Sequence, residues 1–301
     1  MNALSVLRGI ARQEDLNFLL TNRIPRQALT RFMGWWSRIR HPWVRDLSMA
    51  VWQAFTDLDL SEARQSRFGS VHECFTRQLR DGARPIDPDP AVITSPSDGI
   101  VGACGRIGSA GGADQVFQAK GFPYRLAELL GNSPHTDALI EELQGGTFVT
   151  LRLTSSMYHR FHAPCDATLE HVTYISGDTW NVNPIALKRV ERLFCRNERA
   201  VLHLRLSDGT RLLLVPVAAI LVASMRLHAL DVPLNLRYRG PNEMASSAPY
   251  RKGEELGWFE HGSTILLFAP KGHRLATGIS DGKVVQMGQS LLEKCDPDPT
   301  A

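Results

Sequence analysis

The sequence lacks any uninterrupted apolar stretch of about 18 residues, the length that a membrane-spanning helix needs. Cysteine is scarce as well: the five cysteines are scattered, odd in number and never spaced as C-x-x-C. This usage argues against a disulfide framework and a zinc site, and it is typical of a reducing compartment. The first fifteen residues mix apolar side chains with arginines and acids, so we expect no secretory signal. We also find no internal repeat. The chain is therefore not expected to cross a membrane by itself.

What the sequence does contain is an ordinary globular composition. Its 301 residues are 43% hydrophobic and 22% charged, which is sufficient for a substantial buried core. The net charge of +3 is unevenly distributed. Residues 1–50 hold eight arginines and three acids, a balance of +5, which leaves −2 for the remainder. We expect one compact domain with a helical extension rather than two independent domains.

The basic end of the chain is also rich in aromatic residues. Pro25 opens a helical pattern in which apolar residues recur at steps of three and four, and arginines interleave with them. The apolar set is Leu29, Phe32, Met33, Trp36 and Ile39, and the arginines are Arg26, Arg31, Arg38 and Arg40. Tryptophan beside arginine is typical of a helix lying among anionic headgroups. A helix packed on the core, with solvated arginines, fits the same pattern. Nucleic-acid binding is disfavoured, because no binding motif accompanies the arginines.

The remaining pattern predicts an α+β fold, with an N-terminal helical region followed by a mostly antiparallel β-rich catalytic core. Helices are expected over 25–39 and 44–55, and a third is expected from about Ser61. The proline-rich stretch 81–90 ends this part. Short alternating or β-branched runs follow from residue 91, interrupted by one helix over 124–130. We divide the chain into a helical, membrane-facing region, 1–80, and a β-rich catalytic domain, 81–301.

Three motifs in the β-rich part carry reactive side chains. The first is the turn Ser95–Gly99 (SPSDG), in which proline and glycine hold Asp98 on a rigid corner. Asp98 could stabilise its own turn as an Asx-turn, or it could orient a histidine.

The second motif is Tyr158–Pro164 (YHRFHAP), which offers His159 and His162. A helix would place both rings on one face, where a metal site would need a third ligand. In a strand the odd spacing turns them to opposite faces, which favours two separate catalytic roles over metal binding or two structural roles. Tyr158 and Arg160 are expected to support them, and Arg160 could contact a phosphate or carboxylate.

The third motif is Gly262–Thr264 (GST), directly before an apolar strand. Taken alone, Ser263 could be an ordinary hairpin residue. Together with Asp98 and a histidine, it completes the set of side chains needed to activate a hydroxyl.

In these motifs the sequence resembles the phosphatidylserine decarboxylase family. The likeness also covers the segments 75–79, 82–86, 119–124, 129–131, 252–257 and 285–289, in collinear order. The family commonly has leucine where this chain has His261. That departure bears on the rate and pH dependence of the self-cleavage described next. It does not remove the activity, because Gly262, Ser263 and Thr264 are all present.

The resemblance implies a proenzyme that cleaves itself between Gly262 and Ser263, into a large chain (1–262) and a small chain (263–301). Asp98 would orient His162, which would take the proton of Ser263. Ser263 would then become a covalent pyruvoyl group, which accepts the electron pair released with carbon dioxide. His159 would be the general acid that returns a proton. Neither a metal nor pyridoxal phosphate is expected.

The implied function is conversion of phosphatidylserine to phosphatidylethanolamine, by an enzyme peripheral on the cytoplasmic face of the cell membrane. Its partners would be phosphatidylserine in an anionic membrane and the two chains of one proenzyme as a heterodimer, with pairing of heterodimers left open. The alternatives are a pyruvoyl-dependent decarboxylase of a soluble amino acid and a non-enzymatic relative of the fold.

Overall fold

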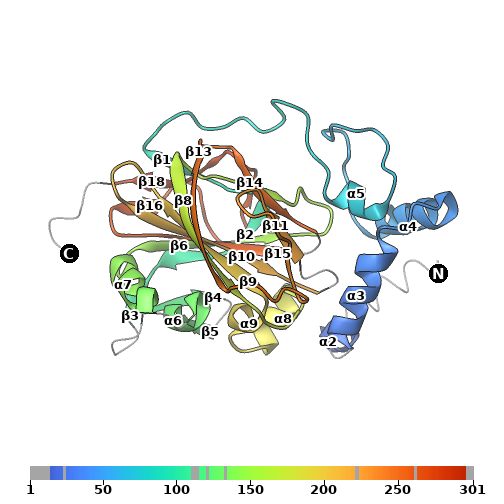
Figure 1. Cartoon of the computed structure of the whole chain (residues 1–301), viewed down its shortest axis with the longest axis horizontal. Coiled ribbons are helices and arrows are strands. Elements are labelled where there is room, and N and C mark those ends of the chain that lie inside the picture. The colour runs from blue at the N-terminus through green and yellow to red at the C-terminus, as the bar shows by residue number, and fades with distance from the viewer. Residues whose placement is uncertain are drawn as a thin grey trace.

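The computed structural model of the chain describes residues 14–22, 25–109, 115–119, 122–131, 134–220, 224–260 and 263–295. Figure 1 shows a β-rich core with the N-terminal helices on one side of it. The predicted α+β fold, helical first and then mostly antiparallel, is confirmed.

The described residues of the N-terminal part form four helices. They are α2 (Glu14–Asn22), α3 (Arg26–Trp36), α4 (Pro42–Phe55) and α5 (Val71–Phe75). Helix α3 begins directly after Pro25, and Pro42 occupies the first turn of α4, where its missing N–H costs nothing. The predicted helices over 25–39 and 44–55 are confirmed. The helix expected from Ser61 is wrong: residues 61–70 are irregular, and the next helix begins at Val71.

Helix α5 begins later than expected because its capping residues lie further along the chain. The Ser70 hydroxyl accepts from the Glu73 N–H at 3.1 Å, and the Glu73 carboxylate accepts from the Gly69 N–H at 2.7 Å. This reciprocal pair is close to a capping box. Ser61, without an acidic residue three positions later, has no equivalent pair.

An eight-stranded antiparallel sheet forms the centre of the β-rich part, in the order β13-β8-β9-β10-β15-β6-β2-β17. Its strands are β2 (Gly99–Arg106), β6 (Thr147–Leu153), β8 (Ala167–Ile175), β9 (Arg199–Arg205), β10 (Arg211–Ala218), β13 (Glu243–Tyr250), β15 (Ser263–Ala269) and β17 (Val284–Val285). All seven residues of β15 are buried. An interior strand is covered on both faces, which explains its continuous apolar run.

Smaller sheets flank this one. A four-stranded sheet has the order β12-β11-β14-β7, and two three-stranded sheets have the orders β1-β18-β16 and β3-β4-β5. Their strands are β1 (Val92–Thr94), β3 (Gly108–Ser109), β4 (Gln115–Ala119), β5 (Phe122–Arg125), β7 (Arg160–His162), β11 (Ser224–Leu227), β12 (Leu234–Asn235), β14 (Glu255–Phe259), β16 (His273–Leu275) and β18 (Ser290–Lys294).

The central sheet separates two hydrophobic cores. On one face, Leu151 and Ile265 pack in a cluster with Phe161 and Phe259 of the four-stranded sheet. On the other face, a second cluster joins the sheet to four short helices. These helices are α6 (Leu126–Leu130), α7 (Pro134–Leu143), α8 (Pro184–Arg189) and α9 (Leu193–Arg196). The single helix expected over 124–130 is thus shorter than predicted, and three further helices accompany it.

Candidate active site

Ser263 is the first residue of β15 and is completely buried. It pairs with Leu153 of β6 and with Ala218 of β10, and its exposed fraction is 0%. Its Oγ has no hydrogen-bond partner within the described part of the chain. Leaving a buried hydroxyl unpaired costs about 1–3 kcal/mol, and such a group calls for an explanation such as a catalytic role. The neighbouring His261 and Gly262, and with them the predicted cleavage bond, lie outside the described residues.

A cavity of about 280 Å³ adjoins Ser263. Its lining combines an aromatic ring, a cation and several polar groups, among them Phe75, Arg152, Thr154, Ser155 and Asn181. The serine therefore borders a space in which another molecule can be bound.

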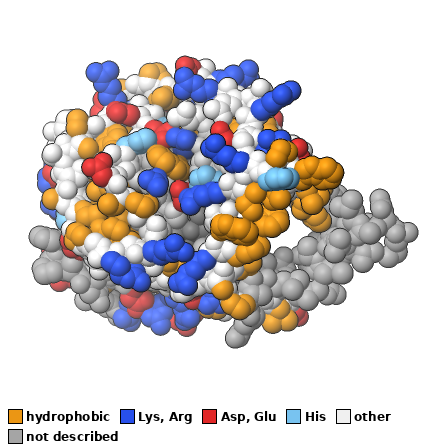
Figure 2. Space-filling view, turned by 45° about the vertical axis from the view of Figure 1, so that its right-hand side comes forward, with side chains coloured by type: hydrophobic (Ala, Val, Ile, Leu, Met, Phe, Trp, Pro, Cys, Tyr) orange, Lys and Arg blue, Asp and Glu red, His pale blue; other side chains and the backbone are white. Residues whose placement is uncertain are grey.

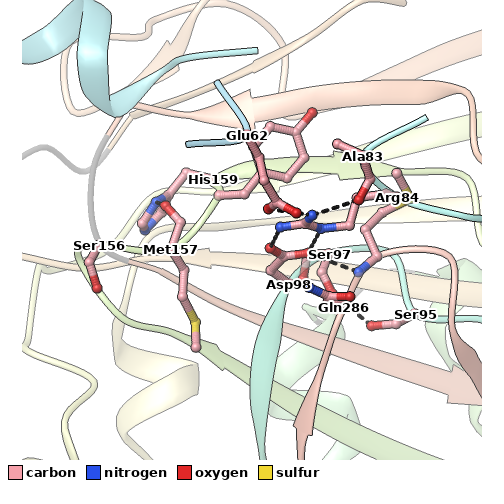
Figure 3. A network of polar contacts seen from close by, with 12 residues as sticks. Glu62, Ala83, Arg84, Ser95, Ser97, Asp98, Ser156, Met157, His159 and Gln286 are labelled. Carbon is pink, nitrogen blue, oxygen red and sulfur yellow. Dashed lines mark hydrogen bonds and ion pairs between the residues drawn. The ribbon is translucent and has the colours of Figure 1, made fainter. Parts of the chain in front are cut away.

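Asp98 is held by an arginine rather than by its own turn. Arg84 donates from Nε to Oδ1 at 2.8 Å and from Nη2 to Oδ2 at 2.6 Å. The Met287 N–H donates to Oδ1 at 2.9 Å. Arg84 also donates from Nη1 to a second carboxylate, that of Glu62, at 2.7 Å. The hydrogen bond to Asp98 raises the pKa of Arg84, so the guanidinium stays charged. Figure 3 shows the group, with the guanidinium of Arg84 between the two carboxylates.

His162 lies in β7 with its ring in a defined tautomer. Its Nδ1 is 2.9 Å from the carbonyl of Gly253, which can only accept, so Nδ1 carries the proton. The other nitrogen, Nε2, is 3.1 Å from the Tyr158 hydroxyl and accepts from it. Burial lowers the pKa of His162, while the Gly253 carbonyl, Glu255 and Asp98 act in the opposite direction. The ring is neutral, with a basic Nε2.

The Gly253 carbonyl is set by a conformation that favours glycine. Gly253 has φ of 80°, and a Cβ there would lie 2.1 Å from Ile86 Cδ1. Only a residue without a side chain fits this position. Two segments that carry the family resemblance, 82–86 and 252–257, thus meet beside His162.

The turn that carries Asp98 contacts His162 through the backbone. The His162 N–H donates to the Pro96 carbonyl at 2.8 Å. Within the described residues, however, no hydrogen bond joins the Asp98 carboxylate to the His162 ring, because each is held by other partners. The structure therefore brings the two predicted residues near one another without the direct orienting contact.

His159 precedes β7 and is fully buried. Its Nδ1 is 2.9 Å from the Met157 carbonyl, so it too carries its proton on Nδ1. Its Nε2 has no hydrogen-bond partner among the residues described, and its ring packs on Phe75 with the centroids 3.9 Å apart. Burial lowers the pKa of His159 to about 3. Figure 3 shows His159 beside Met157, apart from the Asp98–Arg84 pair.

The register of β7 and β14 separates the two histidines along the sheet. His162 is opposite Glu255, at the start of β14. The His159 carbonyl accepts from the N–H of Phe259, the last residue of β14, at 3.0 Å. Ser263 follows four residues after Phe259. Phe75, which contacts His159, also lines the cavity at Ser263. His159 thus lies towards the serine, and His162 lies towards Gly253.

Two groups near these residues were not predicted from the sequence. Arg84 lies inside a segment of the family resemblance, but nothing in that segment indicated that it would bind Asp98. Glu260 is 6% exposed and accepts from Ser224 Oγ at 2.7 Å and from Arg38 Nη2 at 2.8 Å. It connects α3 to the segment that leads to Ser263. Arg160, which was expected to contact a phosphate or carboxylate, binds the carboxylate of Glu255 at 2.6 Å.

Comparison with known proteins identifies the family. The phosphatidylserine decarboxylase family model matches residues 71–293. The phosphatidylserine decarboxylase proenzyme of Brevibacillus brevis is 35% identical over 280 residues, covering 91% of this chain and 96% of the relative. That of Hamiltonella defensa is 32% identical, covering 93% of this chain and 98% of the relative, and that of Aliivibrio fischeri is 33% identical, covering 91% and 96%. The chain therefore belongs to the phosphatidylserine decarboxylase family, a family of carboxy-lyases, and the resemblance read from its motifs is confirmed.

Proposed function

We propose that this protein decarboxylates phosphatidylserine to phosphatidylethanolamine, as a proenzyme that first cleaves itself between Gly262 and Ser263. The observation that carries the proposal is the buried, unpartnered hydroxyl of Ser263 beside a cavity, in a chain that belongs to this family. Inert serines in a β-strand usually satisfy their hydroxyl when they are buried.

Self-cleavage requires a base for Ser263. Once its Oγ–H is deprotonated, Oγ attacks the Gly262 carbonyl carbon, and the amide is converted to an ester with a free amine. Removal of the Ser263 Cα proton then expels the Gly262 carboxylate, and water replaces the amine, which leaves as ammonia. The products are the large chain (1–262) and the small chain (263–301), which remain together as a heterodimer.

Each histidine has its Nδ1 proton directed to a backbone carbonyl, so each presents an unprotonated Nε2. This is the form that a base needs, whereas an acid must first gain a proton on Nε2. We assign His162 as the base for Ser263 and His159 as the acid for the later proton transfer, which is the arrangement that the family resemblance implies. The buried Asp98–Arg84 pair holds the adjoining turn in place and contributes negative charge near His162.

The position of Ser263 fits the pyruvoyl group that the family implies. The residue is buried, its Oγ is bound to no group among the described residues, and it borders a cavity that can admit a substrate headgroup. The pyruvoyl group supplies an electrophilic carbonyl that accepts the electron pair released with carbon dioxide. The chain around it excludes water through Phe75 and Ile220, which line the same cavity.

An apolar surface on α3 and α4 is suited to lipid. Within α4, large apolar side chains recur at four-residue steps and are exposed, with Trp43 83% and Leu47 67% exposed. Figure 2 shows hydrophobic side chains gathered on the side of the molecule that carries these helices, with Lys and Arg side chains near them. The full set is Phe32, Trp35, Trp43, Leu47, Val51 and Phe55. Patches of this kind mark interaction surfaces.

We infer that this surface lies on an anionic membrane, with the enzyme peripheral on the cytoplasmic face. No helix in the described part of the chain is long and apolar enough to span a bilayer. Trp36, by contrast, is turned inward: its Nε1 donates to Ser48 Oγ at 3.1 Å and fixes α3 against α4.

The intact mass of the purified protein, measured together with its products, tests the proposal. Two chains, of which the smaller begins with a pyruvoyl group at position 263, are expected, together with conversion of phosphatidylserine on vesicles. A single full-length mass would support a non-enzymatic relative. Two chains that release carbon dioxide from free amino acids but not from phosphatidylserine would support the soluble-substrate alternative.

A further inference from the structure

Arg152 is a half-buried arginine next to the proposed reaction centre. In β6 it pairs with Thr264 of β15 and with Ile100 of β2, one position along from the Ser263–Leu153 pair. Arg152 and Ser263 both line the cavity of about 280 Å³. Arg152 therefore lines the same cavity as the residue from which the reactive carbonyl would be formed.

Among the described residues, the half-buried guanidinium of Arg152 differs from those of Arg84, Arg160 and Arg199 in having no partner. Arg84 binds Asp98, Arg160 binds Glu255, and Arg199 donates to backbone carbonyls, for example that of Leu129 at 2.7 Å. No hydrogen bond or ion pair to Arg152 occurs among the described residues.

The electrostatic surroundings agree with this geometry. Burial lowers the pKa of Arg152, and no carboxylate offsets that effect. A cation that is partly removed from water without a counter-ion is costly to the folded protein. Such a residue at the edge of a cavity is expected to receive its anion from a ligand.

Phosphatidylserine offers two anionic groups, a carboxylate and a phosphodiester. The carboxylate loses its charge as carbon dioxide leaves, so an arginine bound to it would stabilise the substrate more than the transition state and slow the reaction. The phosphodiester keeps its charge throughout, and it is separated from the reacting amine by only the length of a serine side chain. Arginine also matches phosphate geometry through paired donors.

We propose that Arg152 binds the phosphodiester of the phospholipid substrate and thereby selects a phospholipid over a free amino acid. The hydroxyls of Thr154 and Ser155, in the same cavity lining, supply further donors. This assignment rests on the proposed function, because it names how that same site recognises its headgroup.

The test uses the purified, self-processed protein and dihexanoyl phosphatidylglycerol as a probe. This soluble lipid has the phosphodiester but neither amine nor carboxylate. Its affinity is measured calorimetrically for the parent protein, Arg152→Gln and Arg152→Lys, with uncharged dihexanoylglycerol for comparison. We expect Arg152→Gln to weaken phosphatidylglycerol binding by about 10- to 100-fold, the usual effect of losing a charge-assisted hydrogen bond. Arg152→Lys should lose less, and dihexanoylglycerol binding should not change.

Arg205→Gln is the matched control. Arg205 is on β9 of the same sheet and pairs with Arg211, at the end of β10 opposite to Ala218 and Ser263. The seven-residue separation along β10 is roughly 23 Å. This variant should bind both lipids like the parent protein.

Several results would overturn the assignment. Equal phosphatidylglycerol affinity in Arg152→Gln would do so, and if decarboxylation of phosphatidylserine fell at the same time, Arg152 would bind the carboxylate instead. Failure of both Arg152 variants to self-process would assign the residue to the proenzyme. A parent protein that self-processes but leaves phosphatidylserine unchanged would contradict the proposed function, independently of what the Arg152 variants bind.

Discussion

Replacing His159 with alanine should separate self-processing from decarboxylation. If His162 activates Ser263, the His159→Ala proenzyme should still yield two chains, with the pyruvoyl group formed. Its decarboxylation rate should nevertheless fall by about 10²–10⁴-fold, the usual contribution of a general acid or base. The substitution also removes a ring whose centroid lies 3.9 Å from that of Phe75, which lines the cavity. Part of the activity loss would therefore come from looser packing of the cavity wall.

The structure adds a requirement on the protonation of His159. In the intact chain burial lowers the pKa of His159 to about 3. At pH 7 only about one imidazole in 10⁴ would then carry the second proton, too few for an efficient acid. Cleavage frees the segment before Ser263, and we expect water to reach Nε2 and the pKa of His159 to rise towards 6.5 in the processed enzyme. The titration of isotope-labelled histidine, compared between the Ser263→Ala proenzyme and the mature enzyme, measures this rise.

The assay combines intact mass with the initial rate of phosphatidylethanolamine formation on detergent–lipid micelles. His203→Ala is the matched control: its Nε2 is also buried without a partner in the part of the chain described, and burial lowers the pKa of His203 to about 4. It should process and react like the parent protein. An uncleaved His159→Ala chain would refute the assignment and make His159 the base for Ser263, in line with its position at the Ser263 end of β14.

Four further predictions concern the rest of the site. Ser263→Ala should remain one inactive full-length chain by mass, and two-chain processing would contradict the role of the hydroxyl. Arg84→Gln, which leaves Asp98 without its cation, should slow processing and destabilise the proenzyme by about 3 kcal/mol in urea unfolding, whereas unchanged stability would show that the buried pair is dispensable. Because His159 has a folded pKa of about 3, below its unfolded value of about 6.5, the unfolded state binds an extra proton between these values. The stability of the Ser263→Ala proenzyme should therefore fall with decreasing pH over that range, by at most about 1.4 kcal/mol per pH unit from this group, and adding His159→Gln should reduce the slope. Replacing apolar residues of α4 with serine should weaken binding to anionic vesicles in a salt-insensitive way. Replacing exposed arginines should weaken that binding by about 1 kcal/mol each at low salt. If both sets of variants bind vesicles like the parent protein, the membrane contact lies elsewhere. The apolar set is Trp43, Leu47 and Val51, and the arginine set is Arg31 and Arg40.

Arg38 does not belong in the second of those sets, although its sequence position suggested a lipid contact. Its guanidinium binds the buried Glu260, two residues before Gly262. Replacing it would disturb the segment to be cleaved as well as the basic surface, so a loss of activity in that variant would not report on lipid binding.

The local elements that the sequence predicted are those with strong local signals. Pro25 and the apolar spacing after it predicted α3, and the apolar run after Ser263 predicted β15. Helix α4 begins two residues before the predicted start, because Pro42 occupies its first turn. Trp36 belongs to the apolar set that the sequence assigned either to lipid or to the core, and the packing of α3 on α4 turns it inward to Ser48.

The partners within the site depended on contacts between distant segments. Asp98 and Arg84 meet across a proline-rich loop, and His162 is oriented by a carbonyl 91 residues away. Neither contact has a periodic signal, because both arise from the way in which loops close over the sheet edge. The motifs predicted candidate residues for the site, but they could not predict which atoms bond.

The interior position of β15 has a consequence for the cut protein. The proposed small chain would begin with a strand that is hydrogen-bonded along one edge to β10 and along the other to β6, both belonging to the large chain. It would also contribute β18, which pairs with β1. Breaking one peptide bond would remove none of these strand pairings. The two chains could therefore separate only if the hydrogen bonds of β15 to both neighbouring strands were broken. The two chains of the cleaved protein should therefore not dissociate on dilution. Once denatured, they should not reassemble readily, because β15 would have to insert between two strands of a separate chain.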